Sequence, residues 1–192
     1  MTTIDLSRPG SHRREASSAQ IGPFRIALAV AAVLAIAALI YWDDELRHTE
    51  ACMSAWLARR NGLTDATCTG STVLFMIGEF QSGVTITLGC TVTFLAIPFL
   101  LATSGLFVIH RVSLIKSFLA LISAITFIMI CNHLRLLSIE VAMRIWGAAD
   151  GYSATHILVG TLISTLGVIG GGLAYLYVLL YGDKPQGARN DG

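Results

Sequence analysis

Three residues in this sequence could together perform nucleophilic catalysis: Cys90, Arg135 and His156. A cysteine attacks as its thiolate, which a neighbouring cation stabilises. A histidine within reach can take the thiol proton and later give it to a leaving amine. A fixed guanidinium can stabilise the thiolate or the oxyanion of a tetrahedral intermediate. These residue types therefore indicate thiol-based acyl transfer, provided that the fold brings them to one place.

The composition indicates that a membrane protein must position these residues. Of the 192 residues, 54% are hydrophobic and only 13% are charged, and the mean hydropathy is +0.69. Soluble domains carry about a quarter charged residues. The net charge of +1 offers no basic excess for a phosphate backbone. These values argue against a soluble enzyme and against a nucleic-acid-binding protein.

Several apolar stretches define the helices that this membrane protein should have. A helix that crosses a bilayer needs about 20 mostly apolar residues. Four stretches approach or exceed this length, namely 26–42, 84–109, 117–134 and 157–181. They predict an all-α integral membrane protein, a polytopic helical bundle of about four transmembrane helices plus interfacial helices. The shorter apolar pieces 73–78 and 139–149 are predicted to be interfacial or re-entrant.

The positive charges predict which way the chain crosses the membrane. Cationic residues concentrate on the cytoplasmic side of membrane proteins. One side of this chain carries Arg8, Arg13, Arg14, Arg25, Arg111, Lys116, Lys184 and Arg189, and the other carries Arg47, Arg59, Arg60, Arg135 and Arg144. We therefore expect cytoplasmic tails at 1–25 and 183–192 around a membrane domain at 26–182 in the plasma membrane. Cys90, Arg135 and His156 then lie at one depth, near the outer face.

The outer segment 43–83 contains a predicted helix. It starts with three acidic residues, which favour a helix N-terminus, and Asn61-Gly62 is a stop signal. Its apolar residues Leu46, Met53, Trp56 and Leu57 recur at helical spacing. This helix either lies amphipathically on the membrane surface or is a solvated connector packed on the helix ends.

Two of the four cysteines, Cys52 and Cys68, fall in this outer segment. The segment faces an oxidising compartment, where a disulfide between them can form. Cys131, within an apolar stretch, is interpreted as a small buried hydrophobe.

Each candidate site residue also has a simpler interpretation. An arginine at the end of an apolar run can extend to the lipid headgroups, a histidine at a helix start can be a cap, and a cysteine in a membrane helix can simply pack. Asn132 lies one helical turn before Arg135 on the same face. It could orient Arg135, donate to an oxyanion, or only satisfy its amide within the bundle.

Three short motifs resemble those of the exosortase/archaeosortase family. The stretch Gly83-Val-Thr-Ile-Thr-Leu-Gly-Cys90-Thr resembles the cysteine motif of that family, and Asn132-His-Leu-Arg135 resembles its Asn-x-x-Arg motif. His156-Ile-Leu-Val-Gly160 resembles the third motif. The similarity covers residues 83–165, in the order that the family shows, as in a small member with a minimal core.

The resemblance implies a multi-pass membrane cysteine transpeptidase without a cofactor. Such enzymes act on exported proteins that end in a short motif, one membrane helix and a basic tail. They cleave near the motif and pass the new C-terminus to a membrane-linked acceptor. Cys90 would be the nucleophile, His156 the proton shuttle and Arg135 the electrostatic stabiliser. Cys68, followed by Thr69 and Gly70, is the rival nucleophile.

Two other classes of function remain open at this point. A non-enzymatic small membrane protein, such as a scaffold, an accessory subunit or a transporter, would explain the Gly-rich last stretch. It would not explain why Cys90, Arg135 and His156 share one depth. A metal or haem site could use His133 and His156 with Cys90, although no pair shows close metal-ligand spacing.

Overall fold

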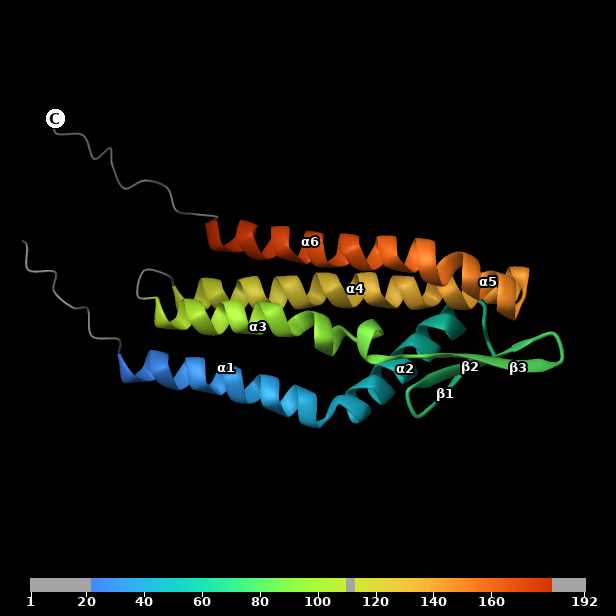
Figure 1. Cartoon of the computed structure of the whole chain (residues 1–192), viewed down its shortest axis with the longest axis horizontal. Coiled ribbons are helices and arrows are strands. Elements are labelled where there is room, and N and C mark those ends of the chain that lie inside the picture. The colour runs from blue at the N-terminus through green and yellow to red at the C-terminus, as the bar shows by residue number, and fades with distance from the viewer. Residues whose placement is uncertain (1–21, 110–112, 181–192) are drawn as a thin grey trace, which may run out of the picture.

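The computed structural model describes residues 22–109 and 113–180, which form a long helical bundle with a small sheet at one end (Figure 1). The predicted tails 1–25 and 183–192 lie almost entirely outside these residues. The helices are α1 (Pro23–Tyr41), α2 (Asp43–Arg60), α3 (Val92–Val108), α4 (Leu114–Trp146), α5 (Ala148–Ala154) and α6 (Gly160–Leu180). A 3₁₀ turn, η1 (Leu88–Cys90), precedes α3, and a π-helical turn, η2 (Thr155–Val159), joins α5 to α6. The strands are β1 (Thr67–Thr69), β2 (Thr72–Ile77) and β3 (Phe80–Thr85).

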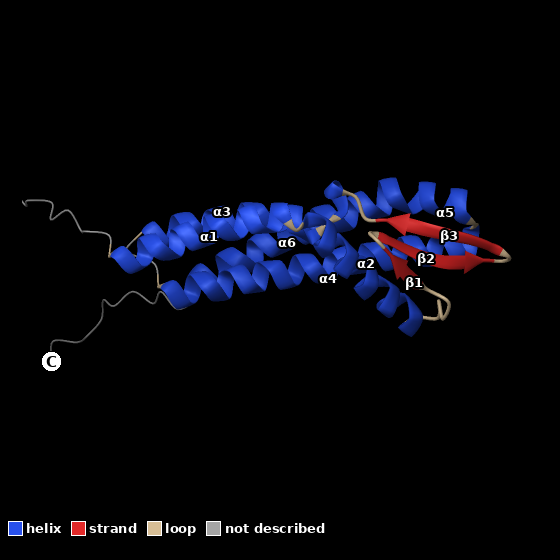
Figure 2. Ribbon diagram, turned by 90° about the horizontal axis from the view of Figure 1, so that it is seen from below, coloured by secondary structure: helices blue, strands red, loops and turns tan. Residues whose placement is uncertain are grey.

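The fold is predominantly helical, as predicted, and α1, α3, α4 and α6 lie side by side (Figures 1 and 2). Among the described residues, three helical runs are long and apolar enough to cross a membrane, namely α1, α4 and Ala148–Leu180. The helix α3 is equally apolar but has 17 residues. Large apolar side chains such as Leu34, Ile122 and Leu173 are more than half exposed on the bundle, which suits a surface in contact with lipid. The start of α1 and the end of α6 lie at the same end of the bundle, opposite the sheet (Figure 1).

The predicted helix boundaries of the second and third apolar stretches are wrong. Residues 84–85 belong to β3, and α3 begins only after Thr91, whose hydroxyl accepts the Thr93 N–H at 3.2 Å as an N-cap. The stretches 117–134 and 139–149 are not separate, because α4 runs through both to Trp146 and is about 50 Å long. The charges at Arg135 and Glu140 do not end the helix, since both side chains are buried within the fold. Gly147, at a φ of +89°, ends it instead.

The sheet was not predicted, and it replaces the interfacial segment expected at 73–78. Its order is β1-β2-β3, with both pairs antiparallel. Thr69 pairs with Thr72 and Ile77 pairs with Phe80, so each connection is a two-residue turn. Gly70 and Gly78 supply the positive φ that such turns need. Because β2 is apolar from Val73 to Ile77, its sequence lacks the alternation that identifies a strand.

The predicted outer helix is confirmed as α2, which ends at Arg60 before Asn61. Its buried face, however, consists of small residues: Ala51, Ser54, Ala55 and Ala58. Met53 and Trp56, expected on the apolar face, are 42% and 47% exposed. The helix is packed on α4 and on the sheet, as the second alternative expects, and its position relative to a membrane surface stays a prediction. Its small residues join a core with Val73 and Phe75 of β2 and with Leu136, Ile139 and Met143 of α4.

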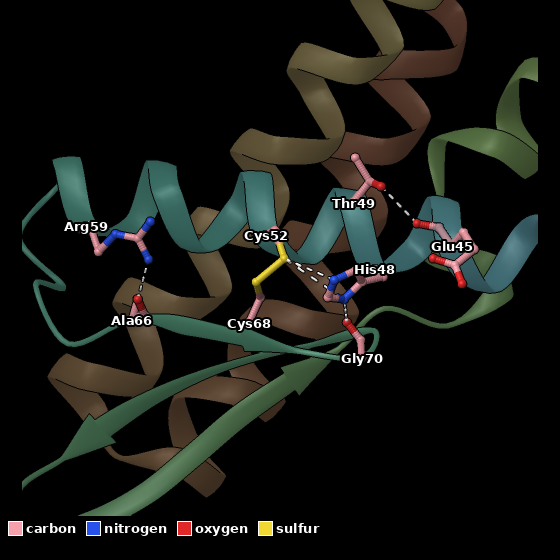
Figure 3. Close-up of a disulfide and its surroundings, with 8 residues drawn as sticks. All are labelled: Glu45, His48, Thr49, Cys52, Arg59, Ala66, Cys68 and Gly70. Carbon is pink, nitrogen blue, oxygen red and sulfur yellow. Dashed lines mark hydrogen bonds between the residues drawn. A yellow bond between two sulfur atoms is a disulfide. The ribbon is translucent and has the colours of Figure 1, made fainter.

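The disulfide between Cys52 and Cys68 is formed and ties α2 to β1 (Figure 3). Beside it, His48 Nδ1 lies 2.7 Å from the Gly70 carbonyl oxygen at the β1–β2 turn. At the other end of α2, Arg59 Nη1 donates to the Ala66 carbonyl at 2.7 Å (Figure 3). These three contacts thus hold β1 and the residues on either side of it against α2.

Candidate functional site

Cys90 lies where the sheet meets the bundle, at the end of η1 between β3 and α3. Its side chain is buried, with 8% of the residue exposed. Its sulfur accepts hydrogen bonds from Thr87 Oγ1 and from Arg135 Nη2, both at 3.3 Å. Cys90 and Arg135, 45 residues apart in sequence, are therefore in direct contact. Thr87 is part of the cysteine motif, but nothing in the motif marks its hydroxyl as a partner of the sulfur.

Arg135 is buried in the middle of α4, not at a helix end as expected. A Cβ placed on Gly160 would lie 3.0 Å from Arg135 Nε. Gly160 thus lets the start of α6 pack directly on the guanidinium. Nε itself has no hydrogen-bond partner in the described structure. The guanidinium is held between η1 and α6, where a charge interacts more strongly than it does in water.

His156 lies in η2 and not at the start of a helix, because α5 precedes it. Its ring stacks on Tyr152, with the centroids 4.6 Å apart. Within the described ranges, His156 makes no hydrogen bond to Cys90 or Arg135. It is one helical turn from Gly160, the residue that packs on Arg135. The structure therefore joins two of the three predicted residues and places the third on the neighbouring turn. That turn is π-helical, a rare geometry found often at functional sites.

Asn132, one turn before Arg135 on α4, is 2% exposed, and neither its Oδ1 nor its Nδ2 has a hydrogen-bond partner in the described structure. The amide therefore neither orients Arg135 by a hydrogen bond nor is satisfied within the bundle. Burying an amide without partners is costly, which makes this side chain available to a bound group.

His133 lines two apolar cavities of about 320 and 420 Å³ that also share Met53 and Met129. It is 5% exposed, and its Nδ1 has no partner among the described atoms. The described residues contain no group of three or more His, Cys, Asp or Glu side chains placed to hold a metal ion. His133 and His156 with Cys90 thus form no such ligand group.

Glu50 of α2 is a site residue that sequence reasoning missed. Its Oε1 accepts hydrogen bonds from Thr91 Oγ1 at 2.8 Å and from the Val92 N–H at 2.9 Å. The carboxyl thereby fixes α2 to the two residues that follow Cys90. Burial raises the pKa of Glu50 above its ordinary value of 4.5, although these hydrogen bonds oppose the shift. No motif marks this role, because Glu50 is one of several acidic residues in α2.

We predict that the free energy of unfolding of Glu50→Gln increases relative to that of the wild type as the pH rises from 4 to 8. A carboxyl whose pKa is raised on folding stabilises the folded state below its unfolded pKa, and this contribution is lost as the pH rises through the folded pKa. Glutamine keeps the acceptor without the buried charge. Glu50→Ala should instead cost about 1–3 kcal/mol at every pH, because Thr91 Oγ1 and the Val92 N–H lose their partner. Denaturant unfolding across this pH range measures both, and a pH-independent difference between wild type and Glu50→Gln would contradict the assignment.

The rival nucleophile Cys68 has no free thiol, because it is bonded to Cys52. The free cysteines among the described residues are Cys90 and Cys131. Cys131 is partly buried where α6 packs closely on α4. A Cβ placed on Gly167 would lie 2.9 Å from the Cβ of Cys131. Cys90 is therefore the free cysteine whose sulfur accepts a hydrogen bond from a guanidinium among the described residues. No protein-family model, curated protein or solved structure matches this chain.

Proposed function

We propose that this chain is an exosortase-like membrane cysteine transpeptidase that cleaves C-terminal sorting signals of exported proteins and transfers them to a membrane-linked acceptor. The observation that carries the proposal is the buried Cys90 sulfur held 3.3 Å from a guanidinium nitrogen of Arg135. A guanidinium that donates to sulfur favours the thiolate. A purely packing role for Cys90 would give no reason to bury this cation beside it, since burying a charge is costly.

The placement of the site supports an outer-face enzyme in the plasma membrane. In the proposed topology, α3 crosses the bilayer together with the three longer helical runs. Four crossings place both ends of the chain on one side of the membrane, and the positive charges near those ends make that side the cytoplasmic one. The sheet, α2 and Cys90 then lie on the outer side. The disulfide between Cys52 and Cys68 fits that side, because disulfides persist in oxidising compartments.

The reaction divides into two acyl transfers. The Cys90 thiol gives its proton to His156, and the sulfur attacks the scissile carbonyl to form a C–S bond and an oxyanion. Arg135 and the unpartnered amide of Asn132 stabilise that oxyanion. The oxyanion collapses, the C–N bond breaks, and His156 returns the proton to the leaving amine. A hydroxyl or amine of the acceptor then gives its proton to His156 and attacks the thioester carbonyl. The new C–O or C–N bond forms, the C–S bond breaks, and His156 returns the proton to the sulfur, which regenerates the thiol.

His156 has to leave its stacked position on Tyr152 for this sequence to proceed. Stacking between two aromatic rings contributes about 0.5–1.5 kcal/mol, which is small beside the barrier of an acyl transfer. Catalytic hydrogen bonds are often completed only when substrate binds. The proposal therefore includes a rotation of the His156 ring towards Cys90 on binding.

Mass spectrometry of the C-terminal peptides of exported proteins tests the proposal. Cells carrying the wild type are compared with cells carrying Cys90→Ala, with Cys131→Ala as the matched control for removing a free thiol. We expect a set of proteins to lose an apolar helix and basic tail in the wild-type and Cys131→Ala cells only. Identical C-termini in all three, at equal protein levels, would overturn the enzyme and favour the non-enzymatic scaffold, accessory subunit or transporter.

A further inference from the structure

The strand β3 is at the edge of the sheet, next to β2 only (Figure 2). The Ile86 N–H donates to the Ser71 carbonyl, so Ile86 points its backbone groups towards the β2 side. Backbone groups alternate in direction along an antiparallel strand. The backbone N–H and C=O groups of Gln81, Gly83 and Thr85 therefore point away from β2. Within the described part of the chain, no other element accepts from or donates to these outward groups.

This edge lacks the usual protection against further pairing. Sheet edges are normally blocked by charged residues, prolines, bulges or a covering element. The six residues of β3, Phe-Gln-Ser-Gly-Val-Thr, include neither a charge nor a proline. Phe80, Gln81, Gly83 and Thr85 are all exposed. An open, uncharged edge of this kind presents a row of donors and acceptors that only another extended chain can match.

The end of β3 is close in sequence to the proposed nucleophile, Cys90. Four residues separate Thr85 from Cys90, so the end of β3 lies at most about 17 Å from the Cys90 Cα along the chain. The helix α5 lies on the β3 side of the sheet and not on the β1 side (Figures 1 and 2). It carries Tyr152, on which His156 stacks. A chain bound along β3 would thus lie on the same side of the sheet as the helix whose Tyr152 stacks on the proposed proton shuttle.

We propose that the segment of the substrate ahead of its membrane helix binds as a fourth strand on the outer edge of β3. This inference rests on the proposed function. The chain of β3 runs from the outer tip of the sheet towards α3 and the bundle (Figure 2). The substrate also runs from its exported domain towards its membrane helix, so the added strand is parallel to β3. Main-chain hydrogen bonds supply the affinity, and alternate side chains of the substrate face the protein and give specificity.

The substitution Gln81→Pro tests this arrangement, with Gln81→Ala as its matched control. Proline removes the outward N–H of residue 81 and is tolerated on an edge strand whose N–H faces solvent. We expect the processed fraction of exported C-termini to fall about fivefold to tenfold in Gln81→Pro, because a hydrogen bond to substrate is lost and its neighbours are displaced. Gln81→Ala keeps the outward N–H and should therefore process a clearly larger fraction than Gln81→Pro. Equal processing by the two variants would overturn strand addition.

Two further measurements keep the test decisive. Formation of the Cys52–Cys68 disulfide and the level of each variant show whether Gln81→Pro has folded. Independently, a synthetic peptide spanning the cleavage site found with the wild type is methylated at one backbone nitrogen at a time. Strand addition predicts that the methyl group slows cleavage by the wild-type protein at every second backbone nitrogen and has little effect at the others. An equal effect at all positions would overturn strand addition. If the wild type processes no C-terminus at all, the proposed function fails, a result distinct from failure of the edge.

Discussion

Replacing Arg135 with glutamine is expected to reduce the proposed processing of C-terminal signals by about 10²- to 10³-fold, the usual cost of removing a group that stabilises an oxyanion. The arginine donates to Cys90 at 3.3 Å and is buried between η1 and α6. Glutamine retains a donor of similar shape but carries no charge. The loss should therefore appear in the rate of the reaction at saturating substrate more than in the affinity for substrate.

Lysine at position 135 distinguishes charge from geometry. Lys keeps the positive charge on a flexible stem, whereas the guanidinium is planar and presents several donors at once. We expect Arg135→Lys to recover part of the activity that Arg135→Gln loses. Arg144→Gln is the matched control, because Arg144 lies on the same helix and pairs with Asp65 at 2.6 Å instead of with the sulfur. This control should process signals at a rate close to that of the wild type.

Alkylation of Cys90 by iodoacetamide provides a readout that needs no substrate. In a Cys131→Ala background, Cys90 is the free cysteine among the described residues. The thiolate is the form that reacts, so Arg135→Gln should slow alkylation at neutral pH and Arg144→Gln should not. A purely structural Arg135 would give the opposite pattern, with faster alkylation as the buried thiol becomes exposed. That result, or unchanged alkylation, would contradict the electrostatic role.

The sequence predicted the helices best where one local signal dominated. The apolar run at 26–42 corresponds to α1, and the acidic start and Asn61-Gly62 stop gave α2 its limits. These signals act within one or two turns and need no tertiary partner. The end of α4 could not be predicted in this way. Glu140 looks like the end of an apolar run until the structure shows that Ser54 of α2 donates to it at 3.0 Å.

The sheet and the site depended on contacts that no local pattern encodes. The β2 residues Thr72–Ile77 are too apolar to alternate, and their strand character comes from pairing with β1 and β3 and from packing on α2. The approach of Arg135 to Cys90 depends on Gly160, whose missing side chain makes room for the guanidinium. The motifs identified these residues as candidates, but the π-helical turn that carries His156 came only from the structure.

Loss of the disulfide should have the largest effect on stability. Cys52 and Cys68 are 16 residues apart, and closing a loop of about that length stabilises a fold by about 3 kcal/mol. We expect Cys52→Ser, Cys68→Ser and the double variant to lose this amount equally, because either substitution opens the same bond. Denaturant unfolding in detergent, with and without a reducing agent, measures the loss. Cys131→Ala is the control, since it should not make unfolding sensitive to reduction.

The same pair of variants also decides between the two candidate nucleophiles. If Cys90 attacks the substrate, Cys52→Ser and Cys68→Ser should have equal and small effects on the reaction at temperatures where the protein stays folded. If Cys68 attacks instead, Cys68→Ser abolishes processing while Cys52→Ser frees the thiol and increases it. The disulfide connects β1 to α2, on the far side of the sheet from β3 (Figure 2). Its removal therefore perturbs the sheet at the edge opposite the proposed substrate strand, and equal, small effects on processing are the expected result.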